Sequence, residues 1–260
     1  MLTKRAVKSL PTVEFPIRLL IGLVFGLACG SALAVGGDDR VTIGRLDVPG
    51  STAARGSGLR RLLWEIDKRT SVDVAPEAVT VNLASEDRLR NFPLLWLPAQ
   101  APIGPLSDVE IERLRRHLQS GGTLVVDNLE GRSGPVADSI RALGRRLFPE
   151  QKLEPVAPDH VMYRSFYLIG TPVGRVSAQT HFDAIFFDGR AVLIVSPNDV
   201  TGALGRDALG QWENPVEPGG ERQRELATRV GLNLVLYVLC LDYKTDQVHV
   251  PFLLRRRATP

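Results

Sequence analysis

Residues 107–131 read SDVEIERLRRHLQSGGTLVVDNLEG, and this stretch decides the fold class. In its first half, apolar residues recur at helical spacing behind a Ser107–Glu110 capping box, which predicts a helix that ends at Gly121 and Gly122. Residues 123–128, TLVVDN, then form a short apolar run typical of a buried strand. A helix followed at once by a buried strand is the repeating unit of an α/β protein with a parallel sheet.

The same alternation extends toward both ends of the chain. Upstream, apolar runs predict strands at 41–48, 78–83 and 94–98, and helical periodicity predicts an amphipathic helix at 58–69. Downstream, Pro135 begins a further helix. We therefore predict an α/β fold with a doubly wound, mostly parallel sheet of the flavodoxin-like type.

The second half of the chain departs from this rhythm. Residues 181–195 predict an added hairpin that turns at Asp188–Gly189 and can extend the sheet in the antiparallel sense. Prolines in residues 151–167 favour an ordered irregular segment. Residues 196–220 form a long loop rich in Gly, Pro and Asn, which is typical of a functional or mobile segment. A final helix at 221–242 is apolar nearly all round from Val230, so we expect it to be buried, together with the Cys240 thiol.

The first 34 residues carry an export signature. An apolar run at 19–34, LLIGLVFGLACGSALA, follows the basic residues Lys4, Arg5, Lys8 and Arg18 and closes on the small-x-small pattern Ala32-Leu33-Ala34. The run is shorter than the roughly 20 residues that span a bilayer, which favours a cleaved signal peptide over an inner-membrane anchor. We predict a periplasmic or otherwise exported protein, which touches the membrane only if residues 19–34 are retained.

Charge excludes one broad class of partner. The net charge is +3, but four of the 32 basic residues and only one of the 29 acidic residues lie within positions 1–34, so the rest is formally neutral. A nucleic-acid binder needs a basic face that displaces counterions from phosphates. Outside the leader, the one local basic run begins a short tail at 255–260. We therefore expect no nucleic-acid partner, whereas partners among envelope proteins stay possible.

Several stretches occur in a fixed order along the exported part: LSDVEIERLRRHLQSGGTLVVDN at 106–128, LFPEQKLEPVAPDHVMYRSFY at 147–167, VLIVSPNDVTGAL at 192–204, and PGGERQRELATRVGLNLVLYVL at 218–239 with DYKTDQVHVPFLL at 242–254. Together they resemble the domain-of-unknown-function family 4159, over one domain from about residue 41 to 254. The resemblance implies a fold similar to class I glutamine amidotransferases. Members of that family are often extracytoplasmic parts of larger membrane proteins, encoded beside ATPases and von Willebrand-type proteins of envelope complexes. They commonly carry two adjacent aspartates after the GG-strand motif, where this chain has Asp127 and Asn128.

Polar residues follow the predicted strands. Because parallel strands end at one edge of a sheet, these side chains are candidates for a ligand site there. The alternative is that they cap helices or form Asx turns. Arg222 joins them because the stretch GGERQRE (219–225) resembles the start of an anion-binding helix. The candidate ligand-binding residues are Asp47, Gln100, Asp127, Asn128, Ser196, Asn198, Asp199 and Arg222.

No catalytic, metal or cofactor site is predicted. The strand-to-helix turn at residues 128–131, where an amidotransferase-like enzyme needs its cysteine, holds no thiol or hydroxyl. The four histidines, His117, His160, His181 and His249, lie far apart and in no zinc pattern. We expect His117 to flank the core and His160 to hydrogen-bond within its own segment.

Three hypotheses follow for the function. The first is an exported, non-catalytic interaction or ligand-sensing module of the bacterial cell envelope. The second is a hydrolase with a carboxylate site at Asp127 and Asp199, which requires these two groups to lie within about 10 Å of each other. The third is a structural partner that docks through the tail VPFLLRRR at 250–257.

Overall fold

The computed structural model describes the backbone of residues 40–257 and the side chains of residues 40–240. The predicted export signal at 1–34, with its apolar run, therefore lies outside the described residues. So do the side chains of the proposed docking tail. Within the described part, no helix combines the length and the apolar character needed to cross a bilayer.

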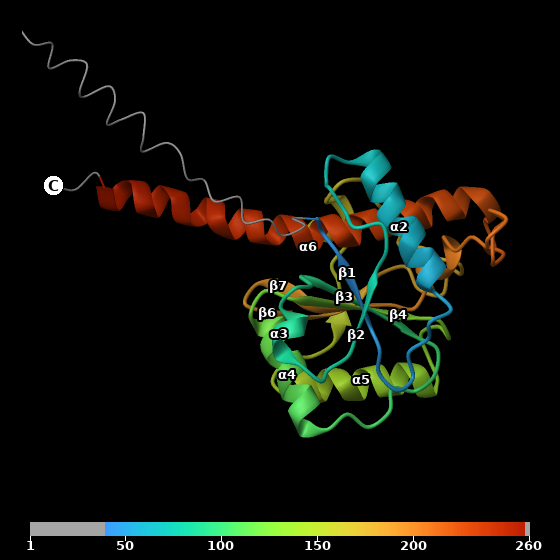
Figure 1. The fold of residues 1–260 in the computed structure, drawn as a ribbon, viewed down its shortest axis with the longest axis horizontal. Helices are drawn as coiled ribbons and strands as arrows, with labels where there is room; N and C mark the ends of the chain where they lie inside the picture. Colours follow the sequence, from blue (N-terminus) through green and yellow to red (C-terminus); the bar gives the residue numbers. More distant parts are fainter. Residues whose placement is uncertain (1–39, 258–260) are drawn as a thin grey trace, which may run out of the picture. The chain divides into compact units, whose positions relative to one another are not determined.

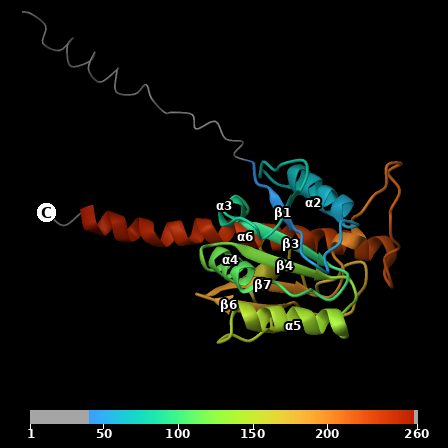
Figure 2. The same cartoon turned by 60° about the horizontal axis from the view of Figure 1, so that its bottom comes forward.

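One seven-stranded sheet organises the chain (Figures 1 and 2). Its order is β2-β1-β3-β4-β7-β6-β5, and β2, β1, β3, β4 and β7 run parallel. The hairpin strand β6 pairs antiparallel with both β7 and β5, which confirms the predicted doubly wound, mostly parallel α/β sheet with an added hairpin. The strands are β1 (Ile43–Leu46), β2 (Val79–Val81), β3 (Leu94–Ala99), β4 (Thr123–Asn128), β5 (Glu154–Pro155), β6 (Asp183–Phe187) and β7 (Arg190–Ser196).

Helices cover both faces of the sheet. The long helix α6 and α2 lie on one face, and α4 and α5 lie on the other (Figure 1). Two short 3₁₀ helices, η1 and η2, lie in the loops of the second half of the chain. The helices are α2 (Gly56–Arg69), α3 (Glu86–Leu89), α4 (Asp108–Gln119), α5 (Pro135–Leu147), α6 (Gly220–Arg257), η1 (Val161–Arg164) and η2 (Thr201–Ala203).

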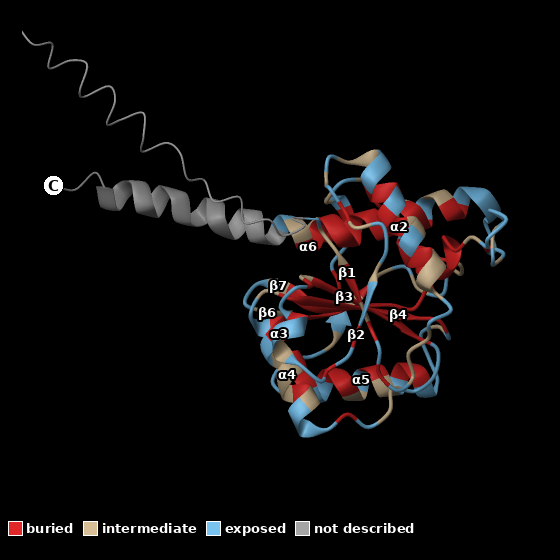
Figure 3. Cartoon of the chain, in the orientation of Figure 1, coloured by how far each residue is buried: buried red, intermediate tan, exposed pale blue. Residues whose placement is uncertain are grey.

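The alternating side chains of the strands build two separate cores (Figure 3). In β3, Leu94 and Trp96 pack toward the α2 and α6 layer, whereas Leu95 and Leu97 pack toward α4 and α5. All four are at most 1% exposed. A strand buried on both faces reads as an unbroken apolar run, because side chains point alternately to opposite faces of a sheet.

The structure corrects three expectations. Residues 151–167, expected to be irregular, contain the two-residue strand β5 and the helix η1. The final helix, expected at 221–242, spans Gly220–Arg257, so it includes the start of the predicted basic tail. The prediction of a buried Cys240 is wrong, because its thiol is exposed. Tyr237 and Val238 are the last buried residues of α6 in the described core, and Leu239 packs against this core while partly exposed.

The long loop that follows β7 is packed against the body of the protein. Val200, Ala203 and Leu204 are at most 1% exposed and belong to the core under α2 and α6. The loop then closes on itself, where Arg206 pairs with Trp212 in an isolated β-bridge. Of the two roles expected for residues 196–220, mobility therefore does not apply to residues 197–204, which are held by packing and hydrogen bonds.

Candidate functional site

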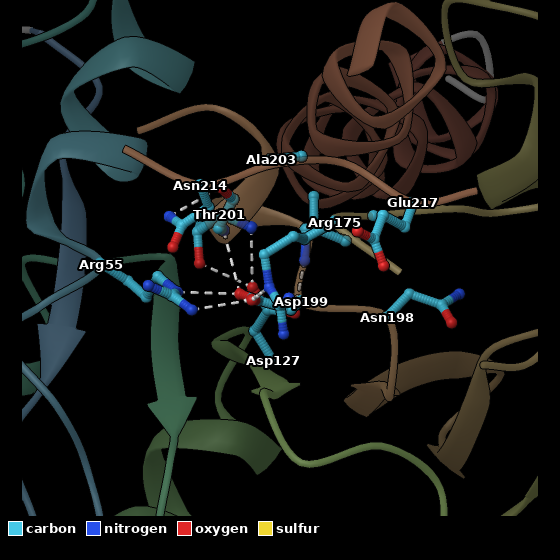
Figure 4. Close-up of polar contacts among 12 residues, drawn as sticks. Arg55, Asp127, Arg175, Asn198, Asp199, Thr201, Ala203, Asn214 and Glu217 are labelled. Atoms are coloured by element: carbon cyan, nitrogen blue, oxygen red, sulfur yellow. Dashed lines mark hydrogen bonds and ion pairs between the residues drawn. The ribbon is translucent and has the colours of Figure 1, made fainter. Parts of the chain in front are cut away.

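The carboxyl ends of β4 and β7 lie side by side, since Asp127 and Ser196 are register partners on these neighbouring strands. The β7 loop continues from Ser196 into η2 and crosses in front of β4. We call the polar residues gathered here the rim cluster: Arg55, Asp127, Arg175, Asn198, Asp199 and Thr201 (Figure 4). Three of these six, Arg55, Arg175 and Thr201, were not among the residues predicted from the sequence.

Asp127 holds the loop to the sheet. Its carboxylate is fully buried and accepts hydrogen bonds from Val200 N–H at 2.8 Å, from Thr201 N–H at 2.8 Å and from the Thr201 hydroxyl at 2.7 Å. Burial, with the negative charge of Asp199 nearby, raises the pKa of Asp127 to about 6, although the three hydrogen bonds oppose this shift. Asp127 therefore supports the first turn of η2, as a helix-capping residue does.

Asp199 is a buried carboxylate held by two arginines. Arg55 donates from Nε and Nη2 at 2.9 and 2.8 Å, Arg175 donates from Nε at 2.5 Å, and Gly202 N–H donates at 3.0 Å (Figure 4). The Asp199 side chain is 0% exposed, whereas those of Arg55 and Arg175 are 14% and 28% exposed. A charge buried this deeply needs such paired and hydrogen-bonded partners.

Close backbone packing surrounds this carboxylate. Asp199 has a positive φ of 53°, a conformation that aspartate tolerates better than most residues. A Cβ on Gly58 would lie 2.1 Å from the carbonyl oxygen of Thr201, and one on Gly174 would lie 2.1 Å from that of Asn198. Glycine is therefore required where α2 and the segment before Arg175 approach the β7 loop.

Asn198 fastens a second segment to the rim. Its side-chain oxygen accepts from the N–H groups of Ala178 and Gln179 at 2.8 and 3.0 Å. Its amide nitrogen donates to the carbonyl oxygens of Pro172 and Gln179 at 3.0 and 2.9 Å. All the hydrogen-bonding capacity of this buried amide is thus used to order residues 172–179.

The polar groups at the start of α6 likewise bond to other groups of the protein. The Gln223 side chain accepts from Gly219 N–H at 3.0 Å and donates to the carbonyls of Gly174 and Glu217. Arg224 is buried and donates to the carbonyls of Ala203 and Asn214. These contacts involve the helix start that resembles an anion-binding site in the sequence.

Of the other predicted site residues, only Ser196 contacts the rim cluster, through Asn198. Asp47 is exposed and accepts from the Ser51 hydroxyl, and the exposed Gln100 contributes a backbone N–H to Gly50. Asn128 forms an Asx turn with Glu130 N–H and bonds the Gly131 carbonyl. The buried Ser196 hydroxyl accepts from Asn198 N–H at 3.4 Å. Arg222 is exposed on the first turn of α6.

Within the described part, no hydrogen bond joins a histidine to Ser196. His160 packs edge-on between Phe186 and Tyr237 and accepts from Met162 N–H at 3.3 Å, which confirms its predicted bond within its own segment. His117 is buried in the core layer of α4. Among residues 40–240, no cluster of three or more His, Cys, Asp and Glu side chains suits a metal ion.

The two rim carboxylates do lie together, because they accept from consecutive backbone N–H groups, those of Thr201 and Gly202. The partners of Asp199 include two arginines that sequence reasoning missed. Arg55 precedes the Gly-Ser-Gly start of α2, a recognisable signal in the first strand-to-helix connection. Arg175 lies in TPVGRV, a stretch without a local pattern, so only the tertiary structure brings it to Asp199.

The fold and the site together define a doubly wound α/β domain with a self-bonded polar cluster at the carboxyl ends of its parallel strands. The chain belongs to the family described as domain of unknown function (DUF4159), whose model matches residues 42–239. This match confirms the family resemblance, and it ends before the last quoted stretch, at 242–254. No curated protein matches the chain.

Proposed function

We propose that the chain is a non-catalytic interaction or ligand-sensing module of the bacterial cell envelope. The observation that carries this proposal is the state of the rim carboxylates. Asp127 and Asp199 are both 0% exposed, and together they accept seven hydrogen bonds from the protein. A general base or a metal ligand needs an oxygen that can reach a substrate or an ion, and these oxygens are engaged within the fold.

A likeness of fold to class I glutamine amidotransferases is part of the same proposal. In such an enzyme the nucleophile stands on the turn after a central strand. Here β4 ends in a turn at residues 128–131, where Asn128 forms an Asx turn. Residues 128–131 hold no thiol or hydroxyl, which favours binding over acyl transfer.

Export is proposed from the leader alone. The basic residues and the apolar run within positions 1–34 support a periplasmic domain, or one anchored in the inner membrane if residues 19–34 are retained. The formal neutrality of the rest of the chain disfavours nucleic acid as a partner and suits other envelope proteins.

A turnover screen tests the absence of catalysis. The purified chain would be assayed against ester, amide and phosphoester substrates, alongside Asp127→Asn, which preserves the shape of the side chain. We expect no turnover that depends on Asp127. Robust hydrolysis by the wild type that Asp127→Asn abolishes while the variant stays folded would overturn the proposal.

One observation keeps a hydrolase as the second candidate. Two buried carboxylates lie close together, and the raised pKa of Asp127, about 6, is of the kind found in general acids and bases. This candidate requires η2 to move away from β4 so that the carboxylate becomes accessible. It predicts activity that rises when Thr201→Ala weakens the contact between η2 and Asp127, whereas the binding-module proposal predicts none.

A further inference from the structure

The two guanidinium groups of the rim cluster are only partly used by Asp199. An arginine has five N–H donors. Within the described part, Arg55 engages its Nε and Nη2, and Arg175 engages its Nε alone. Nη1 of Arg55 and both Nη atoms of Arg175 thus keep unpaired donors. Because each side chain is partly exposed, these donors are available to a ligand from solvent.

The pair is held in a fixed arrangement. Asp199 Oδ2 accepts from Arg55 Nη2 at 2.8 Å and from Arg175 Nε at 2.5 Å, so both guanidinium groups contact one oxygen atom. The backbone N–H of Arg175 also donates to the carbonyl of Asp199 at 2.9 Å. Preorganisation of this kind lowers the entropy cost of binding, since two long side chains are already immobilised.

Arg55 lies at a position that open α/β folds use for ligands. From β1 the chain passes to β2 on one side, whereas β3 lies on the other side of β1. The order of the strands therefore reverses at β1, and ligands of open α/β sheets bind at such points, beyond the carboxyl ends of the strands. Arg55 ends the connection that leaves β1 and directly precedes α2.

The start of α2 adds to the positive potential. Its N-cap residue, Arg55, makes no side-chain capping bond, and its first turn holds no acidic residue. A Cβ on Gly56 would meet nothing within 4 Å, so the backbone there is open. Glu213, from the loop after η2, competes for this turn, because it accepts from the Ser57 hydroxyl at 2.6 Å. Helix starts favour anions, because their N–H groups are unpaired.

We propose that Arg55 and Arg175 form a binding site for an oxyanion, the phosphate or carboxylate group of a small ligand. In the described structure, Asp199 uses three of the ten N–H donors of the two guanidinium groups and leaves the others for the ligand. The planar, forked guanidinium groups match the oxygen atoms of such a group. This inference rests on the proposed binding function and names the chemistry that the module recognises.

Calorimetric titration of the full chain tests the site. Inorganic phosphate, sulfate and acetate would be titrated at matched ionic strength, with chloride as the reference anion. We expect saturable binding of at least one oxyanion. Preference for phosphate and sulfate would indicate a phosphate group in the natural ligand, whereas preference for acetate would indicate a carboxylate.

Variants separate the proposed site from simple charge attraction. Arg175→Gln removes the unpaired donors, and Arg175→Lys keeps the charge beside Asp199 but loses the fork, so both should weaken oxyanion binding at least about tenfold. Arg145→Gln, on the exposed face of α5, is the matched control and should bind as the wild type does. If Arg175→Gln does not fold, Arg175→Lys still provides the comparison.

Two results would overturn the inference: no saturable oxyanion binding by the wild-type protein, or equal binding by the wild type and a folded Arg175→Lys variant. Either result leaves the binding-module proposal standing if the chain shows no turnover. Conversely, Asp127-dependent hydrolysis would end the binding-module proposal whatever the anion titration shows.

Discussion

His117 links the stability of the fold to pH through a single buried side chain. It lies on α4, is 6% exposed, and its Nε2 has no hydrogen-bond partner in the described part of the chain. A Cβ on Gly122 would lie 2.2 Å from this nitrogen, so the imidazole packs directly on the glycine backbone. Burial, together with the positive charge of Arg190, lowers the pKa of His117 from 6.5 to about 4.

His117→Leu should therefore change how stability depends on pH. The folded protein binds the His117 proton less tightly than the unfolded chain does. The stability contributed by the neutral imidazole is thus present above pH 6.5 and is lost as the pH falls to about 4. As the pH falls from 6.5 to about 4, the free energy of unfolding of the variant should rise by about 3 kcal/mol relative to that of the wild type. Urea denaturation at a series of pH values measures it.

The comparison with wild type also isolates His117 from Asp127. The raised pKa of Asp127 acts in the opposite sense, since its contribution is present below pH 3.8 and is lost as the pH rises to about 6. That contribution is common to wild type and variant and cancels in their difference. His181→Gln, at a half-exposed position, is the control. A difference between His117→Leu and wild type that stays constant with pH would show that burial does not hold His117 neutral.

At the scale of elements, α2 is positioned by a contact that only glycine permits. Gly58 lies in the first turn of α2, against the carbonyl of Thr201 in η2. Gly56, two residues earlier in the same turn, faces open space. The same substitution at these two positions therefore separates helix propensity from packing.

Gly58→Ala should destabilise the protein, whereas Gly56→Ala should not. Alanine favours a helix over glycine by about 1 kcal/mol, so Gly56→Ala should be neutral or stabilising. At Gly58 the new Cβ would lie 2.1 Å from a backbone oxygen, and the required shift should cost about 1–3 kcal/mol beyond any propensity gain. Thermal and urea unfolding check both. Equal stability of the two variants would mean that α2 and η2 can separate freely.

The elements themselves were largely predictable. The Ser107–Glu110 capping box forms as expected, with Glu110 accepting from Ser107 N–H at 2.8 Å and Ser107 accepting from Glu110 N–H at 3.3 Å. Local signals of this kind act within one turn of chain, so they can be recognised in the sequence. The strand β5 was missed because its two residues, Glu154 and Pro155, become a strand only by pairing with β6.

At the scale of the whole molecule, the polar rim joins segments that are far apart in sequence. The loop before α2, residues 172–179 and the β7 loop meet there, and rim-cluster side chains supply hydrogen bonds between them. Segments held this way should open together with the body of the protein and not as independent loops.

Asn198→Ala should release residues 172–179 while the sheet stays intact. The amide hydrogens of Ala178 and Gln179 lose their only acceptor in the described structure, the Asn198 side-chain oxygen. Their hydrogen exchange should accelerate at least about tenfold, while the amides of β3 and β4 keep their protection. Exchange followed by mass spectrometry or NMR resolves this pattern. Asn91→Ala, at an exposed position, provides the control. Unchanged exchange at 178 and 179 would contradict the anchoring role of Asn198.

The candidate site was predictable only in part. Asp127, Ser196, Asn198 and Asp199 were expected at the strand ends, and they meet there because parallel strands end at one edge. The choice between a ligand site and internal capping was left open. Asp127 and Asp199 are both enclosed, which favours internal capping for these carboxylates. No local sequence pattern predicts either this burial or the pairing of Arg55 and Arg175 with Asp199.

The sequence by itself determined the alternation of strands and helices, the capping of α4 and the hairpin, because periodicity and turn chemistry act over a few neighbouring residues. It also determined the family, because several stretches of the chain follow in a fixed order. Tertiary structure alone decided that Asp199 lies between Arg55, 144 positions earlier in the chain, and Arg175, 24 positions earlier. It also decided that Asp127 supports η2. Burial removes water from a charged group, so the group needs hydrogen-bond donors that only the fold brings near it.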